Sequence, residues 1–295
     1  MVLTADGEVL TNNHVIDGAT SISVTDVGNG RTYQASVVGY SVSNDVAFLQ
    51  LSGASGLQTI TTAGAAEVSV GEQVVGIGNA GGAGGTPSYA GGAVTATDRS
   101  ITASDDLAGT DEQLTGMIET NADIQAGDSG GPLVNDSGQV IGMDTAGSQS
   151  FQFGSEAQGT GFAIPIATAS SIASQILADR SSSSVHLGPT AFLGVEVSQT
   201  GNGFRPGYGY GGFGSNPGAG VLITGAVAGS PAADAGLGPG DVITSVGGYA
   251  VTSQSALQNV LVADLSPAQA VTIDYTDEAG QQQAVTLTLA SGPAG

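Results

Sequence analysis

The chain has 295 residues, of which 40% are apolar and 10% charged, enough for one large domain or two modest ones. It carries 26 acidic residues against four Arg and no Lys, a net charge of −22, which excludes binding to nucleic acid or to an anionic membrane surface. Cysteine is absent and His occurs twice, so thiolate and multi-histidine metal sites are excluded. We expect no metal and no cofactor.

Short strands separated by Gly, Asn and Asp dominate the first 165 residues. Alternating or continuous apolar runs predict strands at 22–24, 33–38, 46–51, 72–78, 92–101, 115–120, 132–135 and 139–145. Apolar residues at i, i+3, i+4 spacing from Ala169 to Leu177 then predict an amphipathic helix of about three turns. The composition therefore predicts a mainly β domain over 1–179.

A change of composition after this helix predicts a domain boundary. Residues 180–189 are rich in Ser and are expected to be a linker in which His186 is solvated. The second unit, 190–295, contains a Gly- and aromatic-rich insert at 201–220, which is expected to be a surface loop. A short helix at 253–263 and strands at 270–275 and 283–289 follow. No signal peptide and no run long enough to span a membrane is found.

One hexapeptide carries the strongest chemical signal, Gly127-Asp128-Ser129-Gly130-Gly131-Pro132. Serine is a poor nucleophile unless a base and oxyanion donors lie beside it. Glycines on both sides let the backbone turn sharply, so that the amides of Gly127 and Ser129 converge on one point. The alternative is a Gly-rich turn that contains a serine by chance.

Two further residues fit a serine nucleophile. His14 is the one imidazole in the first domain and follows Thr11-Asn12-Asn13. Asp45 begins a buried apolar run, where a carboxylate needs hydrogen-bond donors such as an imidazole N–H. The order His14, Asp45, Ser129 is that of the chymotrypsin template, from which the three catalytic roles are taken.

These segments resemble a known family. TNNHVI, NDVAFLQL, GDSGGPLV and GFAIPI resemble the HtrA/Deg-type serine proteases, and the second unit resembles their PDZ domain through FLGV, SPAADAGL and PGDVI. The resemblance implies a chymotrypsin-like double β-barrel followed by a PDZ domain. Compared with the family the first barrel lacks its opening strand, so we expect a chain shortened at its N-terminus.

The resemblance also implies a setting and an assembly. It points to a protein of the cell envelope or a secreted protein, acting outside the cytoplasm in protein quality control. Family members are often trimers, but the arm that builds the trimer is not in this sequence, so a monomer is expected here.

The oxyanion hole and the primary specificity pocket are assigned by the same resemblance. Gly127, Asp128 and Ser129 form the oxyanion loop, and Asp128 stands where HtrA-type proteins commonly have Asn. Asp123 lies six positions before Ser129, where an Asp near the base of the S1 pocket selects Lys or Arg. HtrA-type pockets are apolar instead, and Ile124 with the strand Phe162-Ala163-Ile164 can supply such a surface. Cleavage after Val, Ala or Leu is therefore expected, with a solvated Asp123.

The PDZ resemblance implies capture of C-terminal peptides. The loop Phe192-Leu193-Gly194-Val195 would hold the terminal carboxylate with its backbone N–H groups, and the peptide would pack against Leu257 and Leu261 of the helix. The alternative is that these residues only close a small β-fold.

Two functions remain open at this point. The first is a serine endopeptidase that degrades unfolded or misfolded polypeptides with His14, Asp45 and Ser129. The second is a catalytically inactive, chaperone-like or PDZ peptide-binding scaffold, because a strand missing from the first barrel would leave an unpaired edge.

Overall fold

The structure is a computed structural model that describes residues 1–17, 19, 21–64, 68–82, 84–105, 110–145, 160–182, 184–198 and 220–292. Within it the chain forms two compact units that divide between Gly188 and Pro189. Each unit has its own apolar core. Because the two are separate bodies, each is described by itself.

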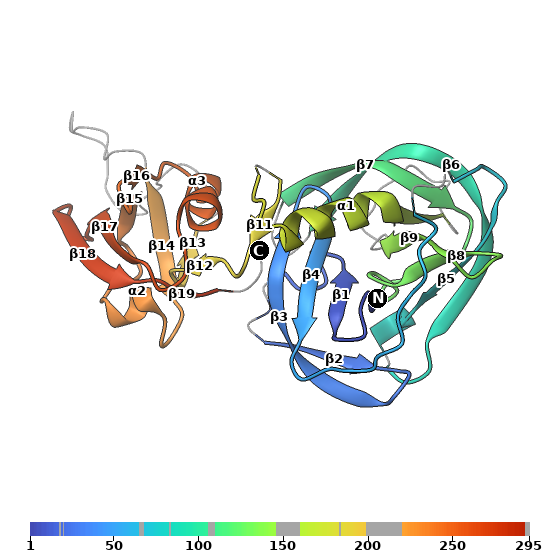
Figure 1. The fold of residues 1–295 in the computed structure, drawn as a ribbon. Coiled ribbons are helices and arrows are strands. Elements are labelled where there is room, and N and C mark those ends of the chain that lie inside the picture. Colours follow the sequence, from blue (N-terminus) through green and yellow to red (C-terminus); the bar gives the residue numbers. More distant parts are fainter. Residues whose placement is uncertain are drawn as a thin grey trace. The chain divides into compact units, whose positions relative to one another are not determined.

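The described residues of the first unit form eleven strands and one long helix, shown in Figure 1. Its elements are β1 (Glu8–Thr11), β2 (Ile22–Asp26), β3 (Arg31–Ser41), β4 (Val46–Leu51), β5 (Gln73–Gly78), η1 (Ala80–Gly82), β6 (Ser88–Asp105), β7 (Thr110–Thr120), β8 (Pro132–Asn135), β9 (Val140–Thr145), β10 (Gly161–Pro165), α1 (Ile166–Leu177) and β11 (His186–Leu187).

The first sheet is five-stranded, in the order β1-β4-β3-β11, with β2 also paired to β3. Strand β4 lies between two neighbours and is apolar on both faces. Val46 and Phe48 pack into the cluster under α1, whereas Leu49 and Leu51 on the other face pack into the core of the sheet itself. Asp45 therefore stands at the end of the most buried strand of this sheet.

Part of the segment 180–189 pairs with the first sheet. Val185 is 2% exposed, and His186 pairs with Tyr40 of β3, with the two rings 4.9 Å apart. The prediction that His186 is solvated was wrong. Pairing with an edge strand satisfies the backbone of a segment that composition alone marks as a linker.

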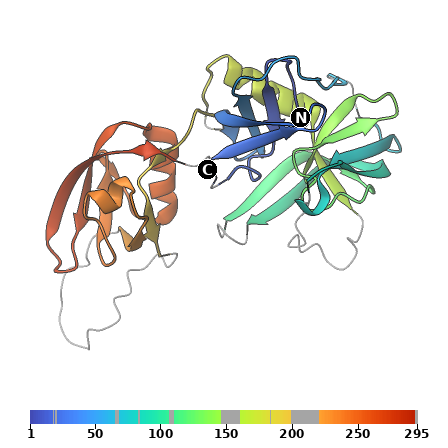
Figure 2. The same cartoon turned by 90° about the horizontal axis from the view of Figure 1, so that it is seen from below.

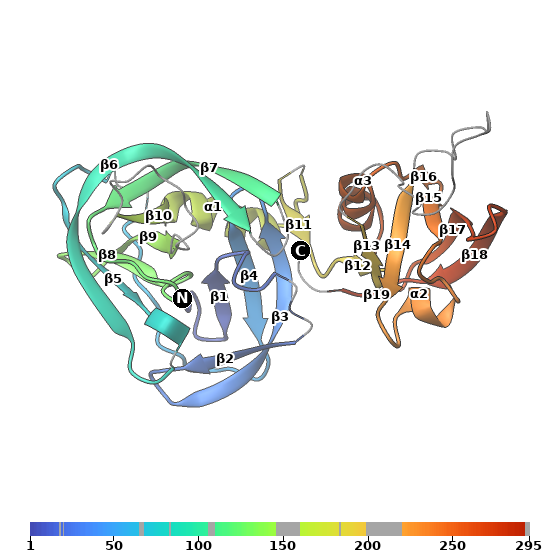
Figure 3. The same cartoon turned by 180° about the vertical axis from the view of Figure 1, so that it is seen from behind.

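The second sheet is a closed barrel in the order β10-β7-β6-β5-β8-β9. Figure 3 shows β6 and β7 as the long strands that curve around it. Inward-facing apolar side chains fill the barrel, including Val74, Ile118, Leu133 and Ile141. Figure 2 shows the blue strands of the first sheet beside the green strands of the barrel within this unit.

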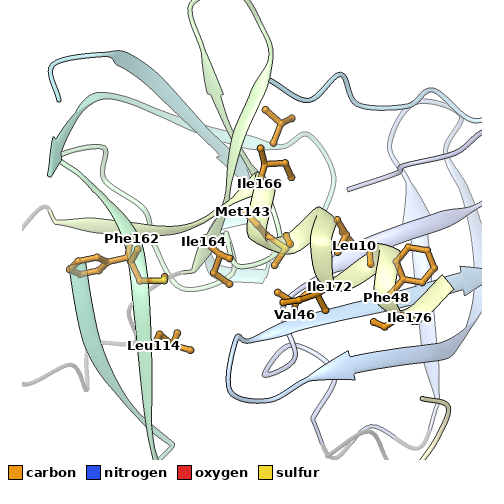
Figure 4. Close-up of a cluster of buried hydrophobic side chains, with 14 of the residues drawn as sticks. Leu10, Val46, Phe48, Leu114, Met143, Phe162, Ile164, Ile166, Ile172 and Ile176 are labelled. Carbon is orange, nitrogen blue, oxygen red and sulfur yellow. The ribbon is translucent and has the colours of Figure 1, made fainter. Parts of the chain in front are cut away.

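Helix α1 packs on both sheets. It follows β10 directly and contacts β9 and β10 of the barrel as well as β3 and β4 of the first sheet. Figure 4 shows its apolar side chains next to Phe48 on one side and Met143 on the other. The helix thereby joins the two sheets into one core, which fixes the position of β4 relative to β9.

The second unit is a small β-fold with two short helices. Its elements are β12 (Ala191–Phe192), β13 (Val195–Val197), β14 (Val221–Ala226), α2 (Pro231–Asp234), β15 (Val242–Val246), β16 (Tyr249–Ala250), α3 (Gln254–Asn259), η2 (Val260–Asp264), β17 (Ala270–Thr276), β18 (Gln282–Thr288) and β19 (Ala290–Ser291). The main sheet runs β13-β14-β15-β17-β18, with β16 on β15, and β12 pairs with β19. The expected insert 201–220 falls outside the described residues except for its last position.

The mainly β architecture, with two sheets in the first unit and a small β-fold in the second, agrees with the fold class expected from the sequence. Among the described residues, no helix has the length and apolarity to cross a membrane.

Candidate active site

His14 and Asp45 form the central contact of the site. The Nδ1 atom of His14 lies 2.9 and 3.0 Å from the two carboxylate oxygens of Asp45, and the backbone N–H of His14 donates to Oδ1 at 3.0 Å. The imidazole is 44% exposed while the Asp45 side chain is 4% exposed. The buried carboxylate therefore contacts the Nδ1 edge of the imidazole ring, and Nε2 lies on the opposite edge, away from Asp45.

Asp45 adopts an unusual backbone conformation. Its φ is 51°, in the left-handed region, which Asp tolerates better than most residues because its short polar side chain bonds locally. Its amide donates to the carbonyl of Val42 at 2.9 Å and so closes the turn before β4. This turn sets the direction of the carboxylate toward His14.

Two residues that the sequence did not single out complete the environment of Asp45. The Nδ2 atom of Asn12 donates to the backbone oxygen and to Oδ2 of Asp45, both at 2.9 Å, and to Oγ1 of Thr145 at 3.0 Å. The hydroxyl of Thr145 lies 3.3 Å from the same Oδ2. Asn12 is 0% exposed. Its place two residues before His14 was the available signal, whereas nothing in the sequence marked Thr145.

The turn that carries Ser129 requires its glycines. Gly127 has a φ of 100°, and a Cβ there would collide with the backbone of the Asn79–Gly82 segment. Gly130 has a φ of 80°, and a Cβ there would collide with Oγ1 of Thr11. The residue after Ser129 therefore lies directly against the strand that leads to His14.

Strand β9 links this turn to Asp45. The amide of Gly130 donates to the carbonyl of Asp144 at 2.9 Å, and the amide of Asp144 donates to that of Gly131 at 2.8 Å. The next residue, Thr145, is the one that contacts Asp45. The structure thus brings His14, Asp45 and the Ser129 turn together around the end of one strand.

The side chain of Asp128 stabilises the turn that carries Ser129. Its carboxylate accepts a hydrogen bond from the Oγ of Ser88 at 2.8 Å and one from the backbone N–H of Gln125 at 2.9 Å. Its own backbone is tied on both sides, to Gln125 and to Gly131. No described residue accepts a hydrogen bond from the amide of Gly127.

The residues expected in a specificity pocket are not all brought together. Asp123 is exposed and accepts a hydrogen bond from the side chain of Gln125 at 2.9 Å. Ile124 is 8% exposed and packs against Gly161 and Gly76. Phe162, Ala163 and Ile164 of β10 are buried in the apolar clusters of the unit. Across the described residues, no three His, Cys, Asp or Glu side chains are grouped as a metal site requires.

The expected peptide loop of the second unit has mixed burial. Leu193 and Leu257 are 1% and 4% exposed and belong to the core, whereas Phe192, Val195 and Leu261 are partly buried. Gly194 has a φ of 79°, and its carbonyl accepts from the hydroxyl of Ser230 at 3.1 Å. In the part of the chain that is described, β13 is the end strand of its sheet.

Comparison with known proteins agrees with both units. Residues 1–143 match the model of the trypsin-like peptidase domain, and residues 191–288 match that of the PDZ domain. Serine protease PepD of Mycobacterium tuberculosis is 32% identical over 98% of this chain and 60% of its own length. The chain belongs to the HtrA/DegP type of trypsin-like serine proteases with a PDZ domain.

Other HtrA-type proteins match over nearly all of the chain. Serine protease Do-like HtrB of Bacillus subtilis is 32% identical over 95% of this chain and 58% of its own. The solved structure of "HtrA-type protease AlgW with tripeptide" is 28% identical, with a TM-score of 0.51, over 98% of this chain and 87% of that one. This HtrA-type chain spans about three fifths of the length of these two curated relatives.

Proposed function

We propose that this chain is a serine endopeptidase whose catalytic residues are His14, Asp45 and Ser129. The observation that carries the proposal is the pair of short contacts between His14 Nδ1 and the buried Asp45 carboxylate. Two main-chain hydrogen bonds between β9 and the Ser129 turn support it, because they attach this turn to the strand whose next residue, Thr145, contacts Asp45.

Each residue has a defined step in the reaction. The Oγ of Ser129 forms a bond to the scissile carbonyl carbon while the Nε2 of His14 takes the hydroxyl proton. Asp45 orients the ring through Nδ1 and stabilises the imidazolium. The C–N bond then breaks as His14 returns the proton to the leaving amine, and water hydrolyses the acyl-enzyme by the same route.

The oxyanion of the tetrahedral intermediate would be bound by the amides of Gly127 and Ser129. Donors that are already oriented stabilise the developing charge without reorganising during the step. Asp128 supports them through its bonds to Ser88 and Gln125, which hold the turn in shape. Asp128 is a positioning residue here and does not touch the substrate.

A fluorophosphonate probe with intact-mass and peptide mapping tests the proposal. We expect one labelled site per chain, mapped to Ser129, in the wild type and in Ser137→Ala. We expect no labelling in Ser129→Ala. Ser137 is an exposed serine in the β8–β9 turn and serves as the matched control. Folded wild-type protein that is not labelled, yet suppresses aggregation of an unfolded protein as well as Ser129→Ala does, would favour the inactive scaffold instead.

Unfolded or misfolded polypeptides are the proposed substrates, with cleavage after Val, Ala or Leu. The exposed, hydrogen-bonded position of Asp123 supports an apolar pocket, since a selecting carboxylate would have to face into the site. A peptide-library profile checks the preference. Dominant cleavage after Arg or Lys that is lost in Asp123→Ala would contradict it.

The PDZ domain is proposed to bind C-terminal peptides beside β13. An end strand offers backbone N–H and C=O groups to an added strand, and the loop 192–195 lies at its start. Titration of the full chain with a peptide acid and with its C-terminal amide tests this. Equal affinity for both would contradict capture of the carboxylate.

We propose that the protein acts outside the cytoplasm. The support is a relative, the "Probable periplasmic serine endoprotease DegP-like" of Halomonas elongata, which is 32% identical over 99% of this chain. Fractionation of the native host with an antibody to the PDZ domain checks the compartment.

A further inference from the structure

One buried carboxyl group has no part in the triad. Asp144 lies on β9 and is 0% exposed, and neither of its carboxyl oxygens has a hydrogen-bond partner among the described residues. The backbone N–H of Ile77 lowers the pKa of this carboxyl group, but it does not form a hydrogen bond of good geometry with either oxygen. An ionised carboxylate in such a place is strongly disfavoured, because nothing replaces its lost hydration.

The backbone of the same residue holds the catalytic turn. Its amide and carbonyl bond to Gly131 and Gly130 at 2.8 and 2.9 Å, immediately after Ser129. A backbone shift that gave the Asp144 carboxyl group access to a hydrogen-bond donor or to water would therefore also change these two hydrogen bonds. The buried side chain and the two bonds to the Ser129 turn therefore belong to the same residue.

A second carboxyl group lies next to it. Gly76 and Gly78 share one face of β5, where a Cβ on Gly76 would lie 3.1 Å from Oδ2 of Asp144 and a Cβ on Gly78 would collide with Asp128. Because these two positions are glycines, there is room for both carboxyl groups next to each other on one face of β5. Asp128 accepts two hydrogen bonds and Asp144 accepts none, so a negative charge on Asp144 would have no hydrogen-bond donor to stabilise it.

The protonation of Asp144 follows from this arrangement. Burial, and then the neighbouring charge of Asp128, raise the pKa of Asp144 to about 8, with a small opposing effect of the Ile77 N–H. Among the described residues, the elements that pack around β9, namely β5, β8, β10 and α1, carry no titratable side chain, and Asp123 in the nearby loop is exposed. The group is therefore neutral at pH 7 and loses its proton in mildly alkaline solution.

We propose that neutral Asp144 is a positioning residue for the Ser129 turn, and that its ionisation releases the turn and sets an alkaline limit on catalysis. This inference rests on the proposed protease function. With two adjacent buried negative charges, either Asp128 leaves its bonds to Ser88 and Gln125 or Asp144 leaves Gly130 and Gly131. Both movements displace the oxyanion amides.

The pH profile of peptide hydrolysis between pH 6 and pH 10 tests the proposal. We expect kcat of the wild type to fall about tenfold from pH 7 to pH 9, with KM little changed, because the oxyanion amides act in the transition state. In Asp144→Asn, which cannot ionise, the ratio of kcat at pH 9 to kcat at pH 7 should stay near one. Asp136→Asn, which removes an exposed carboxylate in the β8–β9 turn, should keep the wild-type fall. The same alkaline fall in wild type and Asp144→Asn would overturn the proposal.

A measurement that needs no proteolysis separates this inference from the proposed function. In the Ser129→Ala background, the infrared C=O band of a protonated carboxyl group should be present at pH 7, be lost by pH 10, and be missing from the Asp144→Asn spectrum. Hydrogen exchange of residues 125–131, corrected for intrinsic pH effects, should increase over the same range only where Asp144 is present. A protein that hydrolyses nothing but shows both signals disproves the protease function and supports the role of Asp144. Lack of the band at pH 7 disproves that role whatever the activity.

Discussion

Single polar residues buried beside Asp45 decide whether its carboxylate can orient His14. Asn12 is the clearest case, since one amide group donates to the Asp45 backbone, the Asp45 side chain and Thr145. Removing such a donor leaves a buried charge with fewer partners, at a cost of about 1.5–3 kcal/mol. Because Asn12 is 0% exposed, we expect it to act through the orientation of Asp45 and not through contact with a substrate.

Asn12→Ala is therefore expected to lower kcat by roughly 10- to 100-fold while KM changes little. Steady-state kinetics with one peptide substrate measures both constants. Asn29→Ala, which removes an amide in the exposed β2–β3 turn, should leave both unchanged. If Asn12→Ala raised KM and kept kcat, Asn12 would belong to substrate binding and its positioning role would be wrong.

The unfolding free energy should show the ionisation of Asp144 independently of activity. Its pKa is raised from 3.8 to about 8 in the folded state, so the folded protein binds the proton more tightly than the unfolded chain. The contribution is complete below about pH 4 and is lost as pH rises through about pH 8. Relative to Asp144→Asn, the wild type should lose on the order of 5 kcal/mol over that range. Denaturant unfolding of both proteins at pH 4, 6 and 8 measures this difference, and parallel pH curves would contradict it.

At the scale of elements, α1 determines how the two sheets meet. Its buried positions Ile166, Ala169, Ile172, Ala173 and Ile176 recur every three or four residues and fill the cluster between β4 and β9. Asp45 immediately precedes β4 and Thr145 ends β9, so the packing of this helix indirectly fixes their contact. Helix α1 carries none of the candidate site residues, yet its packing supports their geometry.

Ile176→Ala should destabilise the first unit by about 2–5 kcal/mol, because the side chain is 1% exposed and its removal leaves a cavity. Leu177→Ala is the matched control on the same helix, since Leu177 is 54% exposed and should change stability by less than about 0.5 kcal/mol. Thermal unfolding measures both variants. Equal losses would show that the helix does not bury the face described.

At the scale of the whole molecule, the chain consists of two units with separate cores. The residues of the protease unit and those of the PDZ unit form different apolar clusters, divided between Gly188 and Pro189. Because each unit is stabilised by its own apolar core, we expect the two units to unfold in separate transitions.

Calorimetry of the full chain tests this. Ile273→Ala, at a 0% exposed position of β17, should lower one transition by several degrees and leave the other in place. Gln282→Ala, at an exposed position of the neighbouring strand, should move neither. A single transition that shifts as a whole in Ile273→Ala would show that the two units unfold together.

The sequence by itself determined the local elements and the chemistry of the motif. Strand β8 spans the predicted residues 132–135, and β9 begins one residue later than predicted, because the apolar pattern that predicts them depends on neighbours in the chain. The expected helix at 253–263 was found as α3 followed by the π-helical turn η2. His14, Asp45 and the Gly-flanked Ser129 were chosen from residue type and order.

Only the tertiary structure decided which groups meet. The pairing of His186 with β3, the bonds of Asn12 and Thr145 to Asp45, and the neighbouring carboxyl groups of Asp128 and Asp144 join residues that are distant in sequence. Their partners depend on which strands become neighbours when the barrel closes and α1 packs. The free-energy cost of burying a carboxylate depends on those same neighbours. From the sequence alone, Asp45, whose carboxylate has hydrogen-bond donors, cannot be distinguished from Asp144, whose carboxyl group has none and stays protonated.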